Sequence, residues 1–268
     1  FERDLSGIYE RDVDIPTESS KIITITGARR VGKTYLLFRI IRNLREWLPH
    51  EHLVYINFED ERLYPSKKEH LTQFLEAYYE LHPDNRKHTI YFFLDEIQNI
   101  PQWHLFVRRL YDNENCRVYI TGSSSKLLSR DLATALRGRT LNYELFPLSF
   151  KEYVRLKELD TNVYASSSRS YLLNAFDAYA SNTAFPELIW LPHDQKQKAL
   201  SEFYELLIYR DLMDRYNLTK VAAIKYLTKY LFINAGNFIS YHKLFNDMNS
   251  QGFRIAKSTL YNYMEYLE

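Results

Sequence analysis

The fold is decided by the stretch Gly27-Ala28-Arg29-Arg30-Val31-Gly32-Lys33-Thr34, which follows the apolar run KIITIT at residues 21–26. A glycine, four residues, a second glycine, a lysine and a hydroxyl residue form the pattern that cradles phosphate between a strand and a helix. The glycines let backbone N–H groups curl around phosphate, Lys33 reaches the β- and γ-phosphates, and the Thr34 hydroxyl ligates Mg²⁺. We therefore predict that residues 27–35, ending with Tyr35, bind ATP and Mg²⁺. The alternative is a glycine-bearing turn with an incidental lysine.

A second motif is Ile90-Tyr91-Phe92-Phe93-Leu94-Asp95-Glu96, an apolar run that ends in two carboxylates. Ligands bind at the carboxyl ends of strands in open α/β sheets. Asp95 is therefore expected to hold Mg²⁺ and Glu96 to polarise the attacking water, and both act in catalysis together with Lys33. The carboxylate next to Asp95 favours hydrolysis, which needs a base for water. The alternative is a strand that ends in a solvated acidic turn.

Hydroxyl and arginine side chains elsewhere in the chain are further candidates for this site. Thr121 or Ser123 closes the next predicted strand and is expected beside the γ-phosphate, although helix capping explains such hydroxyls nearly as well. Arg139, in Arg137-Gly138-Arg139, is a candidate for stabilising transition-state charge, in cis or from a neighbouring subunit. The dipole of a preceding helix suits an arginine there equally. The two arginines inside the cradle also have two interpretations, contact with phosphate or another chain and ordinary surface charge.

Short apolar runs alternate with helical patterns from residue 21 to residue 145. The expected strands are rich in Ile, Val, Tyr, Phe and Thr. They span residues 21–26, 53–58, 89–94, 117–121 and 140–145, with helices expected at 33–47, 67–81, 102–112 and 124–136. Alternation of this kind means a parallel sheet with helices on both faces. We therefore predict an α/β fold, with a doubly wound P-loop core over residues 1–147.

The remainder of the chain consists of helical patterns. The helices are expected at residues 149–159, 169–180, 195–215, 219–234, 240–249 and 257–268. Boundaries near 147 and 217 divide this part into a helical lid or linker, residues 148–217, and a terminal module, residues 218–268. Three helices separated by Gly236-Asn237 and Gly252 are typical of helix-turn-helix and winged-helix modules. We therefore predict a winged helix in the terminal module.

The composition excludes several classes of protein. Hydrophobic residues make up 46% of the 268 residues, which is enough for a full core. The net charge of +1, from 35 basic and 34 acidic residues, favours neither nucleic acid nor an anionic membrane. The single cysteine, Cys116, excludes an intrachain disulfide, and no apolar run approaches a membrane span, so a cytoplasmic location is expected. The chain begins at Phe1 and stops at Glu268 within a helical pattern, which indicates a fragment of a longer protein.

These segments together resemble the AAA-like ATPases of archaea and bacteria that carry a winged helix after the ATPase core. The resemblance is carried by GARRVGKT (27–34), FLDEIQ (93–98), YITGSSS (119–125), LRGRTLNYELFPLSFKEY (136–153), FPELIW (185–190) and YRDLMDRY (209–216). It implies an AAA-type core with the strand order 5-1-4-3-2, in which Lys33 and Thr34 bind ATP with Mg²⁺ and Asp95 and Glu96 act in hydrolysis. It also implies a nuclease-like C-terminal domain, outside residues 1–268, and a glycine pair before FPE, where this chain has Ser181-Asn182-Thr183-Ala184.

The terminal module leaves the partner of the protein open. Its presumed recognition helix, residues 257–268, carries Lys257 near its start but Glu265 and Glu268 near its end, so it is weakly equipped for DNA. DNA contact, protein docking and a lid role are the alternatives for this module. We expect ATP hydrolysis to drive movement or remodelling of a DNA or protein partner, and a homo-oligomer also stays open. A switch with slow turnover and a DNA-binding regulator with a vestigial P-loop are the competing functions.

Overall fold

The computed structural model describes residues 5, 7–64, 67–122, 136, 138–162, 166–181, 183–214 and 216–267. The chain divides into two compact units, Phe1–Trp190 and Leu191–Glu268. This division lies between the predicted boundaries near 147 and 217, and the three-part organisation stays a prediction. The helix expected at 124–136 falls outside the described residues, apart from Leu136. Among the helices that the structure describes, none combines the length and the apolar character needed to traverse a bilayer.

The first unit is built on a five-stranded parallel sheet. Its strands are β1 (Ile22–Thr26), β2 (Leu53–Asn57), β3 (Ile90–Asp95), β4 (Cys116–Gly122) and β5 (Thr140–Glu144). Their order across the sheet is β2-β3-β4-β1-β5, and every neighbouring pair is parallel. Taken from the β5 edge, this is the order 5-1-4-3-2 that the family resemblance implied, so that expectation is confirmed.

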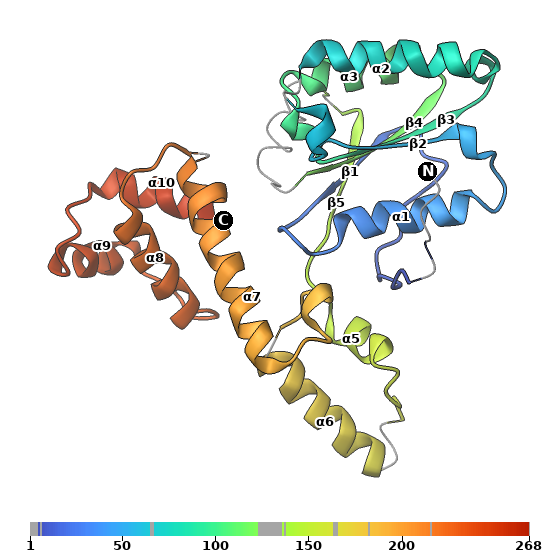
Figure 1. The fold of residues 1–268 in the computed structure, drawn as a ribbon. Helices are drawn as coiled ribbons and strands as arrows, with labels where there is room; N and C mark the ends of the chain where they lie inside the picture. Colours follow the sequence, from blue (N-terminus) through green and yellow to red (C-terminus); the bar gives the residue numbers. More distant parts are fainter. Residues whose placement is uncertain are drawn as a thin grey trace. The chain divides into compact units, whose positions relative to one another are not determined.

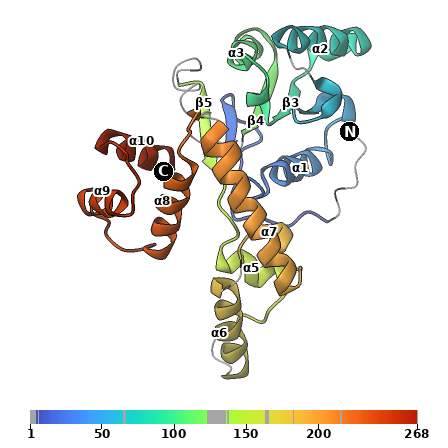
Figure 2. The same cartoon turned by 60° about the vertical axis from the view of Figure 1, so that its left-hand side comes forward.

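Helices cover both faces of the sheet (Figures 1 and 2). The helix α1 (Lys33–Leu44) packs on one face, and α2 (Lys68–Leu81) and α3 (Trp103–Asn113) pack on the other. Successive side chains of a strand point to opposite faces. In β3, Phe92 therefore joins the cluster beneath α2 and α3, whereas Phe93 joins the cluster beneath α1. Burial on both faces explains why β3 is an unbroken apolar run, and it confirms the predicted α/β class.

The first unit continues beyond β5 as two helices, α5 (Phe150–Leu156) and α6 (Ser166–Ser181). Ser149 starts α5 with a capping box, because its hydroxyl accepts from the Glu152 amide and the Glu152 carboxylate accepts from the Ser149 amide. This cap explains why the segment PLSFKEY turns from an extended chain into a helix at residue 150. Short 3₁₀ helices occur at His50–His52, Glu61–Leu63, Pro83–Lys87, Ile97–Asn99 and Pro186–Leu188.

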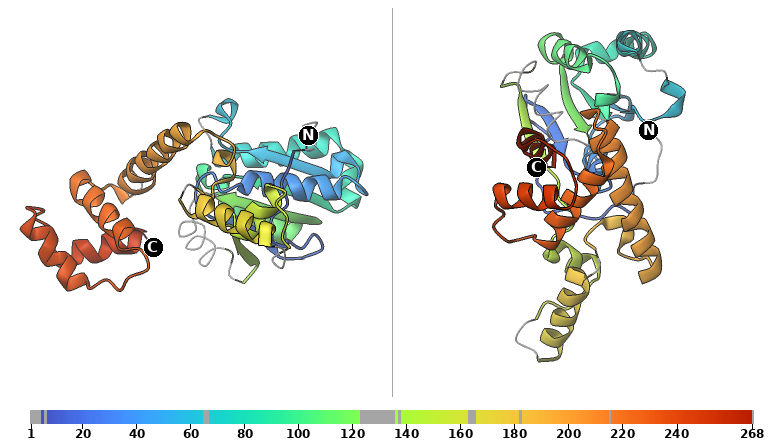
Figure 3. Two further views of the ribbon diagram at one scale, coloured as in Figure 1. Left: turned by 90° about the horizontal axis from the view of Figure 1, so that it is seen from below. Right: turned by 90° about the vertical axis from the view of Figure 1, so that its left-hand side faces the viewer.

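The second unit is helical. It contains α7 (His193–Leu206), a π-helix at Leu207–Asp214, α8 (Val221–Ile233), α9 (Tyr241–Ser250) and α10 (Lys257–Leu267). Its core is centred on Leu227, Leu244 and Leu260, which are fully buried and come from α8, α9 and α10 respectively. The three short helices lie together, as the red end of the ribbon in Figure 3 shows. The described residues of this unit contain no strand, so the winged helix stays a prediction.

The packing of α3 on the sheet gives a test of the first unit. Leu110 is fully buried between α3 and the strands, whereas Leu105 on the same helix is 55% exposed. We expect Leu110→Ala to lower the free energy of unfolding by about 2–5 kcal/mol, because it leaves a cavity in a packed core. Leu105→Ala is the matched control and should change the free energy by less than about 0.5 kcal/mol. Urea denaturation of both variants measures the difference, and equal losses would contradict this placement of α3.

Candidate active site

The loop between β1 and α1 has a backbone that only glycine tolerates at two positions. Gly27 has φ 145° and Gly32 has φ 100°, both in the region that side chains disfavour. A Cβ atom added at Gly27 would collide with the backbone carbonyl oxygen of Leu145, directly after β5. The Leu145 amide in turn donates to the Thr26 carbonyl at 2.7 Å. The strand β5 therefore presses against the start of the loop, which leaves no space for a side chain there.

Lys33 lies at the centre of this loop. Its side chain is almost completely buried, and Nζ donates to the carbonyl oxygens of Gly27 at 3.2 Å and Ala28 at 3.1 Å. Nζ also lies 3.5 Å from Oε1 of Glu96. A buried ammonium with three N–H donors is thus held by the loop that the sequence predicts to bind phosphate. Phosphate oxygens can take the place of these acceptors, so the arrangement fits the predicted cradle.

Asp95 ends β3 beside the first turn of α1. It is 1% exposed, and its carboxylate accepts hydrogen bonds from the hydroxyls of Tyr55, Thr121 and Thr34, with Tyr55 Oη at 2.9 Å from Oδ2. Burial raises the pKa of the Asp95 carboxyl, and the three hydrogen bonds partly offset that effect. Because Mg²⁺ prefers oxygen ligands, the adjacent Thr34 hydroxyl and Asp95 carboxylate fit the metal pair predicted from the sequence.

Glu96 follows β3 in a left-handed backbone conformation, with φ 52°. Its amide donates to Oγ1 of Thr121 at 2.9 Å, and the same hydroxyl donates to Asp95. Its carboxylate meets Lys33 and accepts from the side-chain amide of Gln98. A non-glycine residue in this region costs free energy and persists only where its surroundings hold it. Thr121 and Gln98 therefore hold Glu96 beside the lysine of the loop.

Thr121 belongs to the site, where its hydroxyl contacts Asp95 and Glu96. It is fully buried in β4, and its hydroxyl is both donor to Asp95 and acceptor for the Glu96 amide. A position beside the γ-phosphate stays a prediction. In the structure the Thr121 hydroxyl joins the two acidic residues, because β4 lies next to β3 with Leu94 opposite Ile120. Ser123, the other candidate, lies outside the described residues.

The remaining residues of the loop point in several directions. Val31 is fully buried, whereas Tyr35 is 53% exposed and lies against the ring of Phe38. The two arginines reach carboxylates: Arg29 lies 3.8 Å from Glu59, and Arg30 donates to Glu187 at 2.7 Å. Both ion pairs are partly exposed. The cradle thus contributes its backbone and Lys33 to the centre of the site, while its arginines contact neighbouring segments.

Arg139 lies at the opposite end of the sheet from the loop. Its carbonyl accepts from the amide of Ile22, the first residue of β1, whereas the cradle follows the last residue of β1. Its guanidinium pairs with Asp112 at 3.2 Å. The prediction that Arg139 stabilises charge on a phosphate bound in its own loop is therefore wrong, because the length of β1 separates Arg139 from that loop. Action on a neighbouring subunit stays a prediction, and Arg137 lies outside the described residues.

Three residues of the site were not predicted from the sequence. Tyr55 is an ordinary strand residue by its pattern, and it reaches Asp95 only because β2 pairs with β3, with Asn57 opposite Asp95. Gln98 lies in the segment FLDEIQ, and no role was predicted for it. Arg11 donates to the Val31 carbonyl at 2.9 Å from a segment before β1 for which no element was predicted. The strand order gives a signal for Tyr55, whereas no pattern in the sequence points to Arg11.

Comparison with known proteins identifies similar chains. A family model described as an AAA domain matches residues 19–154. The chain is 36% identical over 261 residues to an uncharacterised protein of Methanocaldococcus jannaschii, with 97% of this chain and 57% of that protein covered. It is 29% identical over 250 residues to an uncharacterised protein of Haemophilus influenzae, with 92% and 60% covered. The chain therefore spans somewhat more than half the length of these relatives.

Among solved structures, the Aeropyrum pernix ORC1 protein in complex with DNA is similar with a TM-score of 0.40 and 12% sequence identity. The comparison covers 92% of this chain and 77% of that one. DnaA from Aquifex aeolicus bound to AMPPCP gives a TM-score of 0.35 and 14% identity, with 81% of this chain and 64% of that one covered.

The close approach at Gly27 gives a test of the loop geometry. We expect Gly27→Ala to lower the free energy of unfolding by about 1–3 kcal/mol or more, because a Cβ at φ 145° meets the carbonyl of Leu145. Gly7→Ala is the control, since nothing lies within 4 Å of a Cβ there. Its effect should stay within about 1 kcal/mol. Urea denaturation compares the two, and an unperturbed Gly27→Ala protein would show that β5 does not press on the loop.

Proposed function

Because the chain belongs to the AAA domain family, we propose that it binds ATP with Mg²⁺ in the loop at residues 27–34 and hydrolyses it. One observation carries the proposal: Lys33 of the loop lies 3.5 Å from Glu96, directly after Asp95, which accepts from Thr34. The cation of Lys33, the proposed metal ligands Thr34 and Asp95 and the candidate base Glu96 thus lie together at one loop. The single cysteine, Cys116, supports the further proposal that the protein works in the cytoplasm.

The phosphate groups of ATP are held by the residues of the loop. Lys33 exchanges its carbonyl acceptors and its contact with Glu96 for phosphate oxygens, and the loop amides donate to the same oxygens. Thr34 and Asp95 would hold Mg²⁺, which when bound neutralises charge on the β- and γ-phosphates. Tyr55 and Thr121 keep the Asp95 carboxylate in place for this role, because each donates a hydrogen bond to it.

Glu96 is the proposed general base. Once Lys33 turns to phosphate, the Glu96 carboxylate is left to accept a proton from water. The water oxygen then bonds to the γ-phosphorus while the bond between that phosphorus and the β–γ bridging oxygen breaks, which yields ADP and phosphate. The Glu96 backbone does not need to reorganise, because Thr121 already holds its amide. Positioning and charge stabilisation account for most of the catalysis in reactions of this class.

We further propose that hydrolysis drives movement or remodelling of a DNA or protein partner. The described residues of the second unit offer a weak basic surface, which leaves the identity of the partner open. Lys225 pairs with Glu205 at 2.8 Å, and Lys220 donates to the carbonyl of Arg254. In α10, Tyr263 is buried and Tyr266 stacks on Tyr216, so Tyr261 is the exposed ring of this helix among its described tyrosines.

Substitution of Glu96 separates binding from hydrolysis. Glu96→Gln should bind ATP with Mg²⁺ as the wild type does, while phosphate release falls by about 10²–10⁴-fold because the base is lost. Lys33→Ala should lose nucleotide affinity, whereas Lys87→Ala, a lysine 76% exposed and paired with Asp84, should keep it. Calorimetry and a phosphate-release assay measure the two properties. Unchanged affinity in Lys33→Ala would refute the cradle, and normal turnover in Glu96→Gln would place the base elsewhere.

An assay with duplex DNA distinguishes three functions: remodelling of a partner, a slow nucleotide-dependent switch and a DNA-binding regulator. We expect DNA to stimulate phosphate release by the full-length protein, with Lys33→Ala as the inactive control. Low turnover with tightly retained ADP, unaffected by DNA, would favour the nucleotide-dependent switch instead. DNA affinity that is equal with and without nucleotide would favour a DNA-binding regulator with a vestigial P-loop. Stimulation by a protein partner alone would assign the remodelling role to that partner.

A further inference from the structure

Arg11 connects the phosphate loop with two later segments of the chain. Its Nη1 donates to the Val31 carbonyl at 2.9 Å, and its Nη2 donates to the Phe146 carbonyl at 2.7 Å. Its Nε donates to Oε1 of Glu152 at 2.8 Å. The donors of all three hydrogen bonds belong to one planar guanidinium, whose rigid geometry fixes the directions of these bonds. The loop, the segment after β5 and the helix α5 are therefore bonded to the same side chain.

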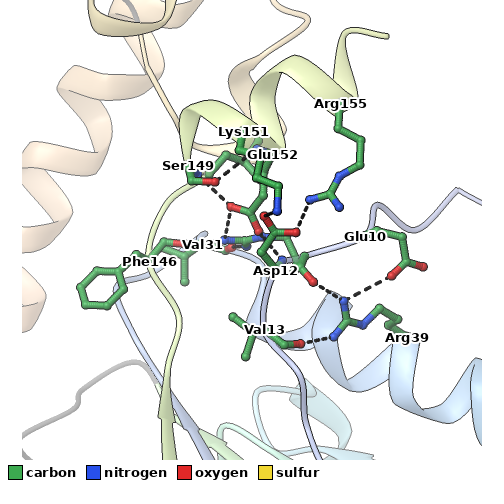
Figure 4. A network of polar contacts seen from close by, with 12 residues as sticks. Glu10, Asp12, Val13, Val31, Arg39, Phe146, Ser149, Lys151, Glu152 and Arg155 are labelled. Carbon is green, nitrogen blue, oxygen red and sulfur yellow. Dashed lines mark hydrogen bonds and ion pairs between the residues drawn. The ribbon is translucent and has the colours of Figure 1, made fainter. Parts of the chain in front are cut away.

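Arg11 and Glu152 form a buried ion pair with further hydrogen bonds, and Figure 4 labels Glu152 with Ser149 and Asp12 around it. The two side chains are 8% and 5% exposed. Oε1 of Glu152 also accepts from the Asp12 amide at 2.8 Å, and Oε2 accepts from the Ser149 amide at 2.8 Å. Burial raises the pKa of Glu152, but the bonds from Arg11 and the two amides outweigh it and hold the pKa below its usual value. The carboxylate is thus charged and fixed, as an anchor for Arg11 requires.

The bond from Arg11 fixes the orientation of one peptide group in the loop. In a trans peptide the C=O and the following N–H point in opposite directions. The Val31 carbonyl points to Arg11, so the Gly32 N–H points away from it. Gly32 has φ 100° and lacks a Cβ, which makes other orientations of this peptide accessible to an unanchored chain. A Cβ built at Gly32 would lie 3.7 Å from Arg11 Nη1, so the guanidinium lies directly against this peptide.

We propose that Arg11 is a positioning residue for the phosphate cradle. By holding the Val31 carbonyl it directs the Gly32 N–H toward the bound β-phosphate, and Glu152 holds Arg11 in that place. The inference rests on the proposed function, because it needs a nucleotide in the loop. It also connects α5 to the nucleotide through Arg11 and the Val31–Gly32 peptide, since Glu152 belongs to that helix. A displacement of α5 withdraws the anchor of Arg11 and thereby frees the Val31–Gly32 peptide.

Substitutions at Arg11 test this role through ADP affinity in the presence of Mg²⁺. Arg11→Met should weaken ADP binding by about tenfold or more, the effect of losing a charged donor that orders one cradle amide. Arg11→Lys should fall short of the wild type, because an ammonium cannot reproduce the planar fork. Arg155→Gln is the matched control. It removes an ion pair between α5 and Asp12 that does not involve the loop, and it should leave ADP affinity unchanged.

A double variant separates positioning from mere stability. Arg11→Met alone leaves Glu152 charged and buried without its cation, so its urea midpoint should fall. Adding Glu152→Gln removes that charge and keeps a side chain suited to the capping box. We expect the double variant to regain part of the midpoint while its ADP affinity stays as low as that of Arg11→Met. The Val31 carbonyl remains without its donor in both proteins.

Three outcomes would overturn the inference. Wild-type ADP affinity in Arg11→Met would show that Arg11 does not order the cradle. Recovery of affinity together with stability in the double variant would reduce Arg11 to a structural anchor. A loss in Arg155→Gln equal to that in Arg11→Met would assign the effect to α5 attachment in general. A different result, the absence of nucleotide binding by the wild-type protein, would refute the proposed function itself.

Discussion

The site depends on the register of three parallel strands. Because β1, β4 and β3 are neighbours, their carboxyl ends lie at one edge of the sheet, with Thr26 opposite Gly122 and Leu94 opposite Ile120. This register brings the loop after β1 and the acidic residues at the end of β3 to the same place, although α1, β2 and α2 lie between them in sequence. The order is maintained by two apolar clusters, one on each face. A shift of one residue in β3 would turn Phe92 and Phe93 to the wrong faces, so packing the core also fixes the position of Asp95.

Two buried carboxylates in the first unit illustrate how charge is kept in the interior. Asp95 accepts from three hydroxyls, which are neutral donors, and burial still raises its pKa. Glu152 has a guanidinium and two backbone amides, and its pKa falls. The difference follows from their hydrogen-bond donors. The hydroxyls that donate to Asp95 carry no charge to offset its burial, whereas the charge of Glu152 is matched by Arg11.

The sequence predicted the α/β fold and the segments that the structure brings together at the loop, whereas it did not predict the contacts between distant segments, and this division has a physical basis. Strands and helices have local periodicities, and the phosphate loop and the Asp95-Glu96 pair are each continuous in the chain, so short patterns reveal them. Contacts between distant segments have no such pattern: Arg11 and Glu152 are 141 residues apart. Thr121 was placed at the right edge, but its hydroxyl partners depended on the register with β3. Arg139 directly precedes β5, so its position at the amino end of a parallel strand follows from the predicted strand at residues 140–145, whereas its proposed action on phosphate rested on its residue type alone.

Two acidic residues after β5 connect to the phosphate loop, and the free energies of their ion pairs differ widely. Glu187, from FPEL, pairs with Arg30, and both side chains are more than 40% exposed. Such pairs contribute about 0–1 kcal/mol and are screened by salt. Glu152, from SFKEY, is buried and fully hydrogen-bonded, so breaking its pair with Arg11 costs several times more, about 3–5 kcal/mol. The exposed pair can therefore open at little cost, whereas the buried pair stays intact when it does. One segment thus has a contact with the loop that opens readily, and the other holds the Val31 carbonyl of the loop through Arg11.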